Sequence, residues 1–328
     1  MNKKLVAVAV AAGLVLPMIS AQAVEVADKK LEVYGKLHVS LSSIDAAGTT
    51  ADNYLLESHA SRIGFKGAIP LDGGLVGTYK YEVEADVTDG TLLAGQRNTY
   101  LGLKGSFGEF RLGRHDSPLK MAQGKFDQFG DTAGDLKNAG SHDGENRNAS
   151  SITYLGKFDN LAVNVQLIPG EGNGTAAGQG ITDTTSIGVS YKAGPLYLAV
   201  ANDSYDDTGA AAGTDSSMTR IVATYKMGNM QLGLLSQSGV EKIAASTEKE
   251  DWLGLSFAMK VGSKNKFKVQ HITTEDNAAV KTKAEQTSIG FDHELGKKGT
   301  VYAMFNTYDE TGTANDKDTL SVGYVLKF

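Results

Sequence analysis

The 328-residue sequence contains no cysteine and only five prolines. Without cysteine no disulfide framework can form, so packing and hydrogen bonding alone must stabilise the fold. Scarce proline, together with 39 glycines and 24 tyrosine and phenylalanine residues, suits many strands joined by tight turns. The formal net charge is −6, which excludes the broad basic surface of a nucleic-acid-binding protein.

Long apolar runs are also missing beyond the first twenty-odd residues. No uninterrupted run there approaches the roughly 18 residues that mark a membrane helix. Only helices and closed barrels can cross a bilayer, because lipid cannot satisfy free backbone groups. The composition therefore excludes a helical membrane protein and leaves a barrel open.

The N-terminus has the three-part layout of a secretory signal peptide. Lys3 and Lys4 precede an apolar run over residues 5–18, and Ala21-Gln-Ala23 supplies small residues for cleavage. We predict a signal peptide over residues 1–23 and a mature chain over residues 24–328. Removing two lysines with the leader moves the formal charge from −6 to −8.

Beyond residue 30, apolar and polar residues alternate with a period of two. Leu31, Val33 and Leu37 share one face of the first such segment, whereas Lys36 and His38 lie on the other. This pattern is typical of strands with one apolar face, and amphipathic helix spacing is absent. The predicted strands are 31–43, 54–68, 74–85, 96–106, 109–116, 149–157, 160–168, 184–192, 195–204, 217–227, 229–238, 251–260, 265–274, 286–294, 299–308 and 318–328.

The connections between these sixteen strands alternate in length. Seven are short: 70–73, 107–108, 158–160, 193–194, 227–228, 261–264 and 295–298. Eight are longer and polar: 44–53, 86–95, 117–148, 169–183, 205–216, 239–250, 275–285 and 309–317. Strict alternation places all turns at one end and all loops at the other, as in outer-membrane barrels. We predict an all-β fold, a 16-stranded antiparallel transmembrane β-barrel.

Aromatic residues gather at the short-turn end of the predicted strands. Rings with polar edges prefer the level of lipid headgroups, so they predict one interfacial girdle. Trp252, near the loop end of its strand, is a candidate for the other girdle. The residues at the short-turn end are Phe107, Phe110, Phe158, Tyr191, Tyr197, Tyr225 and Phe328.

The connection over residues 117–148 is the longest in the chain. Structureless connections of that length are uncommon and usually functional or disordered. Phe126 and Phe129 can anchor it, and Asp127, Asp131 and Asp135 recur every four residues. We therefore predict that this third external loop folds inward and narrows the pore.

Several motifs, taken in order, resemble the general (diffusion) porin family of Gram-negative outer membranes. In that family a third loop carries carboxylates opposite arginines on the barrel wall, and the barrels are usually homotrimers. The C-terminal strand, here ending in Tyr324, Leu326 and Phe328 on one face, signals to the assembly machinery. The motifs are Val33-Tyr-Gly-Lys-Leu37, Ser61-Arg-Ile-Gly-Phe-Lys-Gly67, Gly102-Leu103, Gly108-Glu-Phe-Arg-Leu-Gly-Arg114 before Pro118-Leu119, Phe126-Asp-Gln-Phe-Gly-Asp131, Arg147-Asn148 and Ile152-Thr-Tyr154.

The resemblance implies a constriction between two sets of charges. Arg62, Arg97 and Arg147 are the wall candidates, and Asp127, Asp131 and Asp135 are the loop candidates. Strand parity supports the first assignment, because the apolar Ile63 and Phe65 place Arg62 on the lumen side. An arginine facing lipid near the bilayer midplane would cost about 2–4 kcal/mol. Many family members carry Pro-Glu-Phe-Gly-Gly in this loop, whereas this chain has Gln128-Phe-Gly-Asp131.

Other functions remain open at this stage. The loop aspartates are also possible calcium ligands, and His59 and Ser61 share one face, which suits a hydrolase. A surface β-sandwich adhesin and a solute-selective porin are further alternatives.

We predict a non-enzymatic outer-membrane channel without a cofactor, which passes ions and small hydrophilic solutes by passive diffusion. Its other expected partners are outer-membrane lipid, the assembly machinery and further copies of the chain. The preference for cations or anions is not predicted by the sequence.

Overall fold

Alternating apolar and polar residues form strands along most of the chain. The computed structural model describes residues 25–26, 30–47, 53–170, 183–205, 216–243, 246–277, 281–313 and 315–328. The predicted leader, residues 1–23, lies outside these ranges. The elements are β1 Glu25–Val26, β2 Leu31–Ala46, β3 Asn53–Ser58, β4 Arg62–Pro70, η2 Asp72–Gly74, β5 Val76–Glu84, β6 Gly95–Gln96, β7 Thr99–Gly105, β8 Gly108–Asp116, α2 Pro118–Ala122, η3 Leu136–Asn138, β9 Arg147–Phe158, β10 Leu161–Ile168, β11 Thr184–Ala193, β12 Leu196–Tyr205, β13 Ser216–Met227, β14 Met230–Ile243, β15 Ser246–Val261, β16 Asn265–Asp276, β17 Lys283–Glu294, β18 Gly299–Glu310 and β19 Lys317–Lys327.

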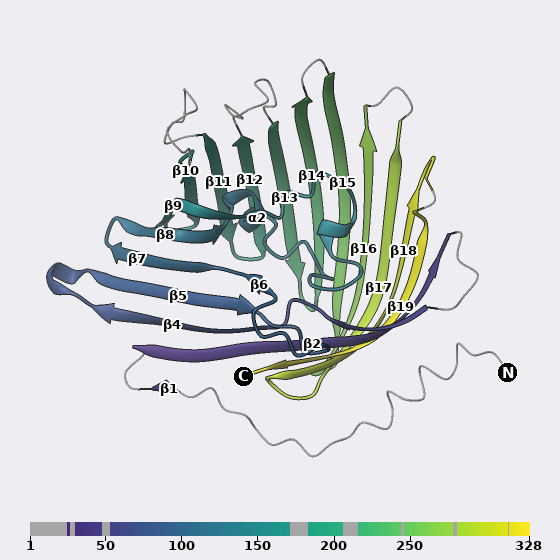
Figure 1. Cartoon of the computed structure of the whole chain (residues 1–328), viewed down its shortest axis with the longest axis horizontal. Helices are drawn as coiled ribbons and strands as arrows, with labels where there is room; N and C mark the ends of the chain where they lie inside the picture. Colours follow the sequence, from purple (N-terminus) through teal and green to yellow (C-terminus); the bar gives the residue numbers. More distant parts are fainter. Residues whose placement is uncertain are drawn as a thin grey trace.

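The strands form one closed antiparallel sheet (Figure 1). Each wall strand pairs with its neighbour in the chain, and the last, β19, pairs with β2 through Leu326 and Leu37. Because β3 and β4 both pair with β2, and β6 and β7 both pair with β5, the 18 strands from β2 to β19 make 16 wall strands. The predicted 16-stranded barrel is confirmed, and a two-sheet sandwich is excluded.

The barrel wall has two different faces. In β13, Arg220 and Val222 are buried on one face, whereas Ile221 and Tyr225 on the other are 56% and 48% exposed. The same alternation in neighbouring strands produces an apolar outer surface, which suits contact with lipid chains. The described residues contain no helix long and apolar enough to cross a membrane.

The predicted strand 54–68 is interrupted, which corrects one sequence boundary. Ser58 lies opposite Val39 of β2, and Arg62 lies opposite Lys36. The predicted strand therefore advances four residues where β2 advances three, which leaves one extra residue. Ala60 at this bulge has a left-handed φ of 46°. A bulge of one residue reverses which face each later side chain occupies. It is this bulge that places Arg62 on the inner face beside Lys36.

Two aromatic residues do not lie where the girdle prediction placed them. Trp252 is 2% exposed on the inner face, and its Nε1 donates to Glu250. The hydroxyl of Tyr197 donates to the carbonyl of Ala122 and its ring packs inside the barrel. Both predictions were wrong because they used only the position of the residue along its strand. The alternation of inner and outer side chains places both rings inside the barrel, away from lipid.

An added charge should destabilise the barrel more on the outer face than on the inner face. Replacing Leu255, which is 54% exposed on the outer wall, with arginine (Leu255→Arg) should cost about 2–4 kcal/mol of folding free energy if it lies near the bilayer midplane. Thr300→Arg, which adds the same charge beside an inner cavity, should cost much less. Urea unfolding in lipid vesicles measures the folding free energy of both variants, and heat-modifiable gel migration monitors the folded fraction. Equal losses would contradict the assignment of faces.

Candidate functional site

The long connection between β8 and β9 contains the structural elements of the site. Ser117 caps α2 by accepting a hydrogen bond from the Lys120 amide, and Pro118 begins the helix. The connection ends at residue 146, two residues before the predicted boundary, because Arg147 and Asn148 pair with β8. We call residues 117–146 the inner segment.

One side of the inner segment packs against the wall through apolar side chains. In Figure 1 it lies among the wall strands, with α2 near β11 and β12. Phe126 and Leu136 are fully buried in this contact. The cluster joins Leu119, Ala122, Phe126, Leu136 and Ala139 of the segment to Ala199, Ala201, Met218, Val222, Leu235, Trp252 and Ile272 of β12 to β16.

Phe126 occupies a notch made by two wall glycines. A Cβ atom on Gly254 would stand 2.6 Å from the ring Cζ of Phe126, and one on Gly233 would stand 3.1 Å from its Cδ2. Such distances leave no room for a larger residue at either wall position. The missing side chains therefore let the ring approach the strands closely.

Buried polar contacts reinforce this attachment. Arg220, with no exposed surface, donates to Glu145 Oε1 over 2.7 Å and to the carbonyl oxygens of Leu119 and Asp143. Gln270 Oε1 accepts from the Gln128 amide over 2.9 Å. Losing one partner of a buried charge pair is strongly destabilising, so these contacts restrain the segment.

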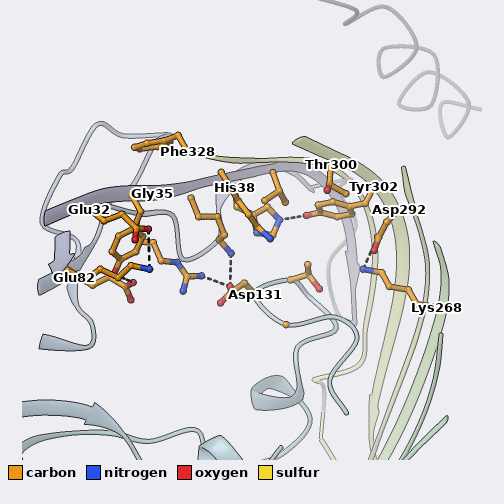
Figure 2. A pocket seen from close by; sticks show the side chains of 18 residues that line it. Glu32, Gly35, His38, Glu82, Asp131, Lys268, Asp292, Thr300, Tyr302 and Phe328 are labelled. Carbon is orange, nitrogen blue, oxygen red and sulfur yellow. Dashed lines mark hydrogen bonds and ion pairs between the residues drawn. The ribbon is translucent and has the colours of Figure 1, made fainter. Parts of the chain in front are cut away.

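The opposite side of the inner segment reaches the wall at Asp131. Its Oδ2 lies 2.6 Å from both Lys36 Nζ and Arg62 Nη2, and these contacts converge on the labelled Asp131 in Figure 2. Lys36 and Arg62 face each other directly across β2 and β4. Like charges in that arrangement repel, and the single carboxylate relieves the repulsion.

The backbone and the charge of Asp131 both reflect this bridge. Its φ of 60° is left-handed, and its amide donates to Asp135 Oδ2 over 2.6 Å. Burial alone would raise the pKa of Asp131, but Lys36 and Arg62 outweigh burial and hold that pKa well below its usual range. Asp131 is therefore ionised at neutral pH.

Two cavities meet at this bridge. The larger, about 1000 Å³, lies toward the long loops, and the smaller, about 650 Å³, lies toward the short turns. Arg62, Gly130, Asp131 and Thr132 line both. All six residues that the sequence nominated, Arg62, Arg97, Arg147, Asp127, Asp131 and Asp135, line the larger cavity.

Arg97 and Arg147 line the cavity but do not contact the segment's aspartates. Arg97 Nε lies 2.9 Å from Glu82 and its Nη1 lies 3.2 Å from Glu84. Arg147 Nε lies 2.9 Å from Asp116. Their charges are therefore partly balanced within the wall.

Asp127 and Asp135 mainly hold the inner segment's own backbone. Asp127 accepts from the Phe129 and Leu136 amides, and Asp135 accepts from the Lys137 and Asp131 amides. Burial, followed by the charge of Asp135, raises the pKa of Asp127, and burial also raises the pKa of Asp135. Asp131 is therefore the aspartate of the three that bridges to wall cations.

Sequence reasoning missed Lys36, the second cation of the bridge. Its signal was present, because Lys36 stood on the polar face of the first predicted strand. Its pairing with Arg62 requires the register of β2 with β4, which the bulge after Ser58 sets.

The alternative sites are not assembled. His59 Nε2 contacts Ser40 Oγ over 2.6 Å, whereas Ser61 Oγ is engaged with the His38 backbone, so His59 and Ser61 do not form a nucleophile and base pair. Over the described ranges, no group of three or more acidic or histidine side chains is arranged to hold a metal ion.

The model of the family described as "Gram-negative porin" matches residues 6–313. The chain belongs to this family. It is an outer-membrane porin, which forms a channel for the diffusion of small solutes and has no enzymatic activity.

Similar proteins include other outer-membrane porins. Outer membrane porin protein 32 of Delftia acidovorans is 26% identical, over 92% of this chain and 88% of that protein. The anion-selective porin from Comamonas acidovorans has a TM-score of 0.79 and 22% identity, over 91% of this chain and 99% of that one. A trimer form of OmpT from Vibrio cholerae has a TM-score of 0.70 and 16% identity, over 91% and 99% of the two chains.

The C-terminal residue of the porin completes the wall. Backbone groups of Phe328 and Gly35 exchange hydrogen bonds of 3.1 Å, and the Phe328 ring covers Gly35, where any side chain would collide with it. In Figure 2 Phe328 and Asp131 lie on opposite sides of β2. Tyr324 is exposed on the outer face.

His142 attaches the far end of the inner segment to β15. Its Nδ1 lies 3.1 Å from Glu250 Oε2, which also accepts the His142 amide, and its Nε2 lies 3.6 Å from Glu241. The hydrogen bond with Glu250 raises the pKa of His142 against the opposing effect of burial. The charged imidazolium therefore strengthens this contact.

Removing the Phe126 ring should loosen the inner segment. Phe126→Ala empties the glycine notch and should weaken the packing by about 3–5 kcal/mol. We expect faster proteolysis within residues 117–146 and noisier single-channel currents. Phe305→Ala, on the outer wall, is the control. Equal protease resistance in wild type and Phe126→Ala would contradict the anchoring role.

The segment should also respond to pH through His142. Because its pKa is raised in the folded porin, the stabilisation is complete below about pH 6.5, the ordinary histidine pKa, and is lost as the pH rises through the raised value. Proteolysis of the segment should therefore accelerate above that range. His142→Gln should reduce the change, and the remainder reports buried carboxyl groups of the segment such as Asp127, whose pKa is also raised. A pH dependence as large as that of the wild type would reject the assignment.

Proposed function

We propose that the inner segment forms the constriction of this diffusion channel, with Asp131 and the wall cations Lys36 and Arg62 at its narrow region. The observation that carries this proposal is that the two cavities share Arg62 and Asp131. On one side the apolar cluster fills the space between the segment and β12 to β16. Solutes then pass on the other side, beside β2 to β9 and β17 to β19, whose residues line the two cavities.

The balance of charge at the bridge itself favours anions. Two cations, Lys36 and Arg62, share one ionised carboxylate, which leaves a net positive charge. Asp127, whose pKa is raised, adds less than a full negative charge. Fixed charges at a narrow, weakly screened place act strongly on passing ions, and polar solutes align with the transverse field.

The mature porin in this proposal begins after residue 23 and assembles as a homotrimer. The N-terminal layout supports leader cleavage, and a trimer form is known for OmpT, which shares the fold. The outward row of Tyr324, Leu326 and Phe328 supports recognition by the assembly machinery. N-terminal sequencing and native gel migration of the purified protein measure the first two points.

Neutralising Asp131 should increase anion preference. Two unit charges 4 Å apart interact by about 1 kcal/mol even in bulk water, so Asp131→Asn should raise the anion-to-cation permeability ratio by about fivefold. Asparagine also tolerates the left-handed backbone at this position. Reversal potentials in a KCl gradient measure the ratio. Asp127→Asn removes a carboxyl group that holds the backbone and should change the ratio much less.

The wall cations give the converse test. Lys36→Gln and Arg62→Gln should each lower the anion-to-cation ratio in the same measurement. Unchanged reversal potentials in all three variants at the bridge would refute the proposed constriction. Saturable block of the current by one solute would instead favour a solute-selective porin.

A further inference from the structure

Lysines occupy equivalent positions at the short-turn end of the barrel. Eight wall strands run toward this end, namely β4, β7, β9, β11, β13, β15, β17 and β19. In six of them the last described residue on the inner face is an exposed lysine, whereas β4 ends in Pro70 and β17 in Glu294. We call these six the turn-side ring: Lys104, Lys157, Lys192, Lys226, Lys260 and Lys327.

Their parity with buried inner residues establishes the face. Lys226 follows the buried Arg220 and Val222 of β13 at even spacing, and Lys260 follows Trp252 in β15 in the same way. Lys327 lines the smaller cavity directly. The ring therefore surrounds the mouth through which the smaller cavity opens.

Cations also face cations across the strands of this half. Lys36 lies opposite both Arg62 and Lys327, so three adjacent strands present three positive charges in one row. Lys260 lies opposite Lys266. Directly opposed like charges destabilise a sheet. Asp131 relieves this repulsion at the Lys36 and Arg62 pair.

The loop end of the inner face has the opposite sign. There Glu241 lies opposite Glu248, and Glu250 lies opposite Asp276. His142 of the inner segment stands between Glu241 and Glu250. On β14 to β16 the inner face is thus acidic near the long loops, and eight carboxyl groups against six lysines and arginines line the cavity on that side. The turn end is basic.

We infer that the turn-side ring is a second anion-selecting region, separate from the constriction, and that the axial charge difference makes the channel rectify at low salt. This inference rests on the proposed diffusion channel. Lysines around the mouth concentrate anions and repel cations over a Debye length, which is about 30 Å at 0.01 M salt and about 3 Å at 1 M.

The test replaces all six ring lysines with glutamine and records oriented single channels in KCl. At 0.01 M the anion-to-cation permeability ratio should fall by about twofold or more, whereas at 1 M, where charges are screened, it should match wild type. At low salt, the difference between the currents at positive and negative voltage should be smaller in this variant than in wild type. The same six lysines changed to arginine keep the charge and should retain wild-type behaviour.

A smaller pair of variants controls for folding and total charge. Lys192→Gln, Lys226→Gln and Lys260→Gln together remove three charges from the ring and should shift the low-salt ratio partway. Lys249→Gln, Lys281→Gln and Lys283→Gln remove three charges from exposed sites at the loop end and should not lower it as much. If the folded ring variants keep the wild-type ratio and rectification while Asp131→Asn changes selectivity, the ring inference is overturned and the constriction stands.

Discussion

The interior of this porin depends on one electrostatic contact between the inner segment and the wall. Lys36 and Arg62 face each other across β2 and β4, and Asp131 lies 2.6 Å from each. Without the carboxylate, two cations would repel in a partly desolvated place. With it, the inner segment is held across the lumen from its apolar attachment. In the proposed constriction, one contact therefore influences stability, the position of the segment and the charge that a solute meets.

The inner segment has two sides because its sequence mixes two kinds of anchor. Leu119, Phe126 and Leu136 pack against the apolar, glycine-containing wall of β12 to β16. Arg220 and Glu250 then fix its ends through hydrogen bonds that an apolar contact alone would not orient. This division leaves the polar side of the segment free to border water. The inner segment is therefore held against the wall by apolar and by charged contacts.

Local pattern predicted the wall of this protein well. The alternation of apolar and polar residues and the alternating lengths of the connections predicted the closed barrel. Both signals can be read from residues that are close together in the sequence. The inward direction of Arg62 followed from Ile63 and Phe65 in the same way. The six nominated charges do line one cavity.

Contacts between distant segments were not predictable in this way. The partnership of Lys36 with Arg62 depends on the register and bulge of β2 with β3 and β4, and no local pattern specifies that register. Asp127, Asp131 and Asp135 look equivalent in sequence. The left-handed turn at Asp131 distinguishes them, because it sends one carboxylate to the wall while the others bind backbone amides.

A double-mutant cycle tests the central contact most directly, since it measures the coupling between Asp131 and the wall cations. Urea unfolding in vesicles should give a loss of about 1.5–3 kcal/mol for Asp131→Asn in the wild-type porin, the range for hydrogen bonds to charged groups. In the background of Lys36→Gln and Arg62→Gln, the same substitution should cost almost nothing. Equal losses in both backgrounds would show that Asp131 does not bridge these cations, and would contradict the account.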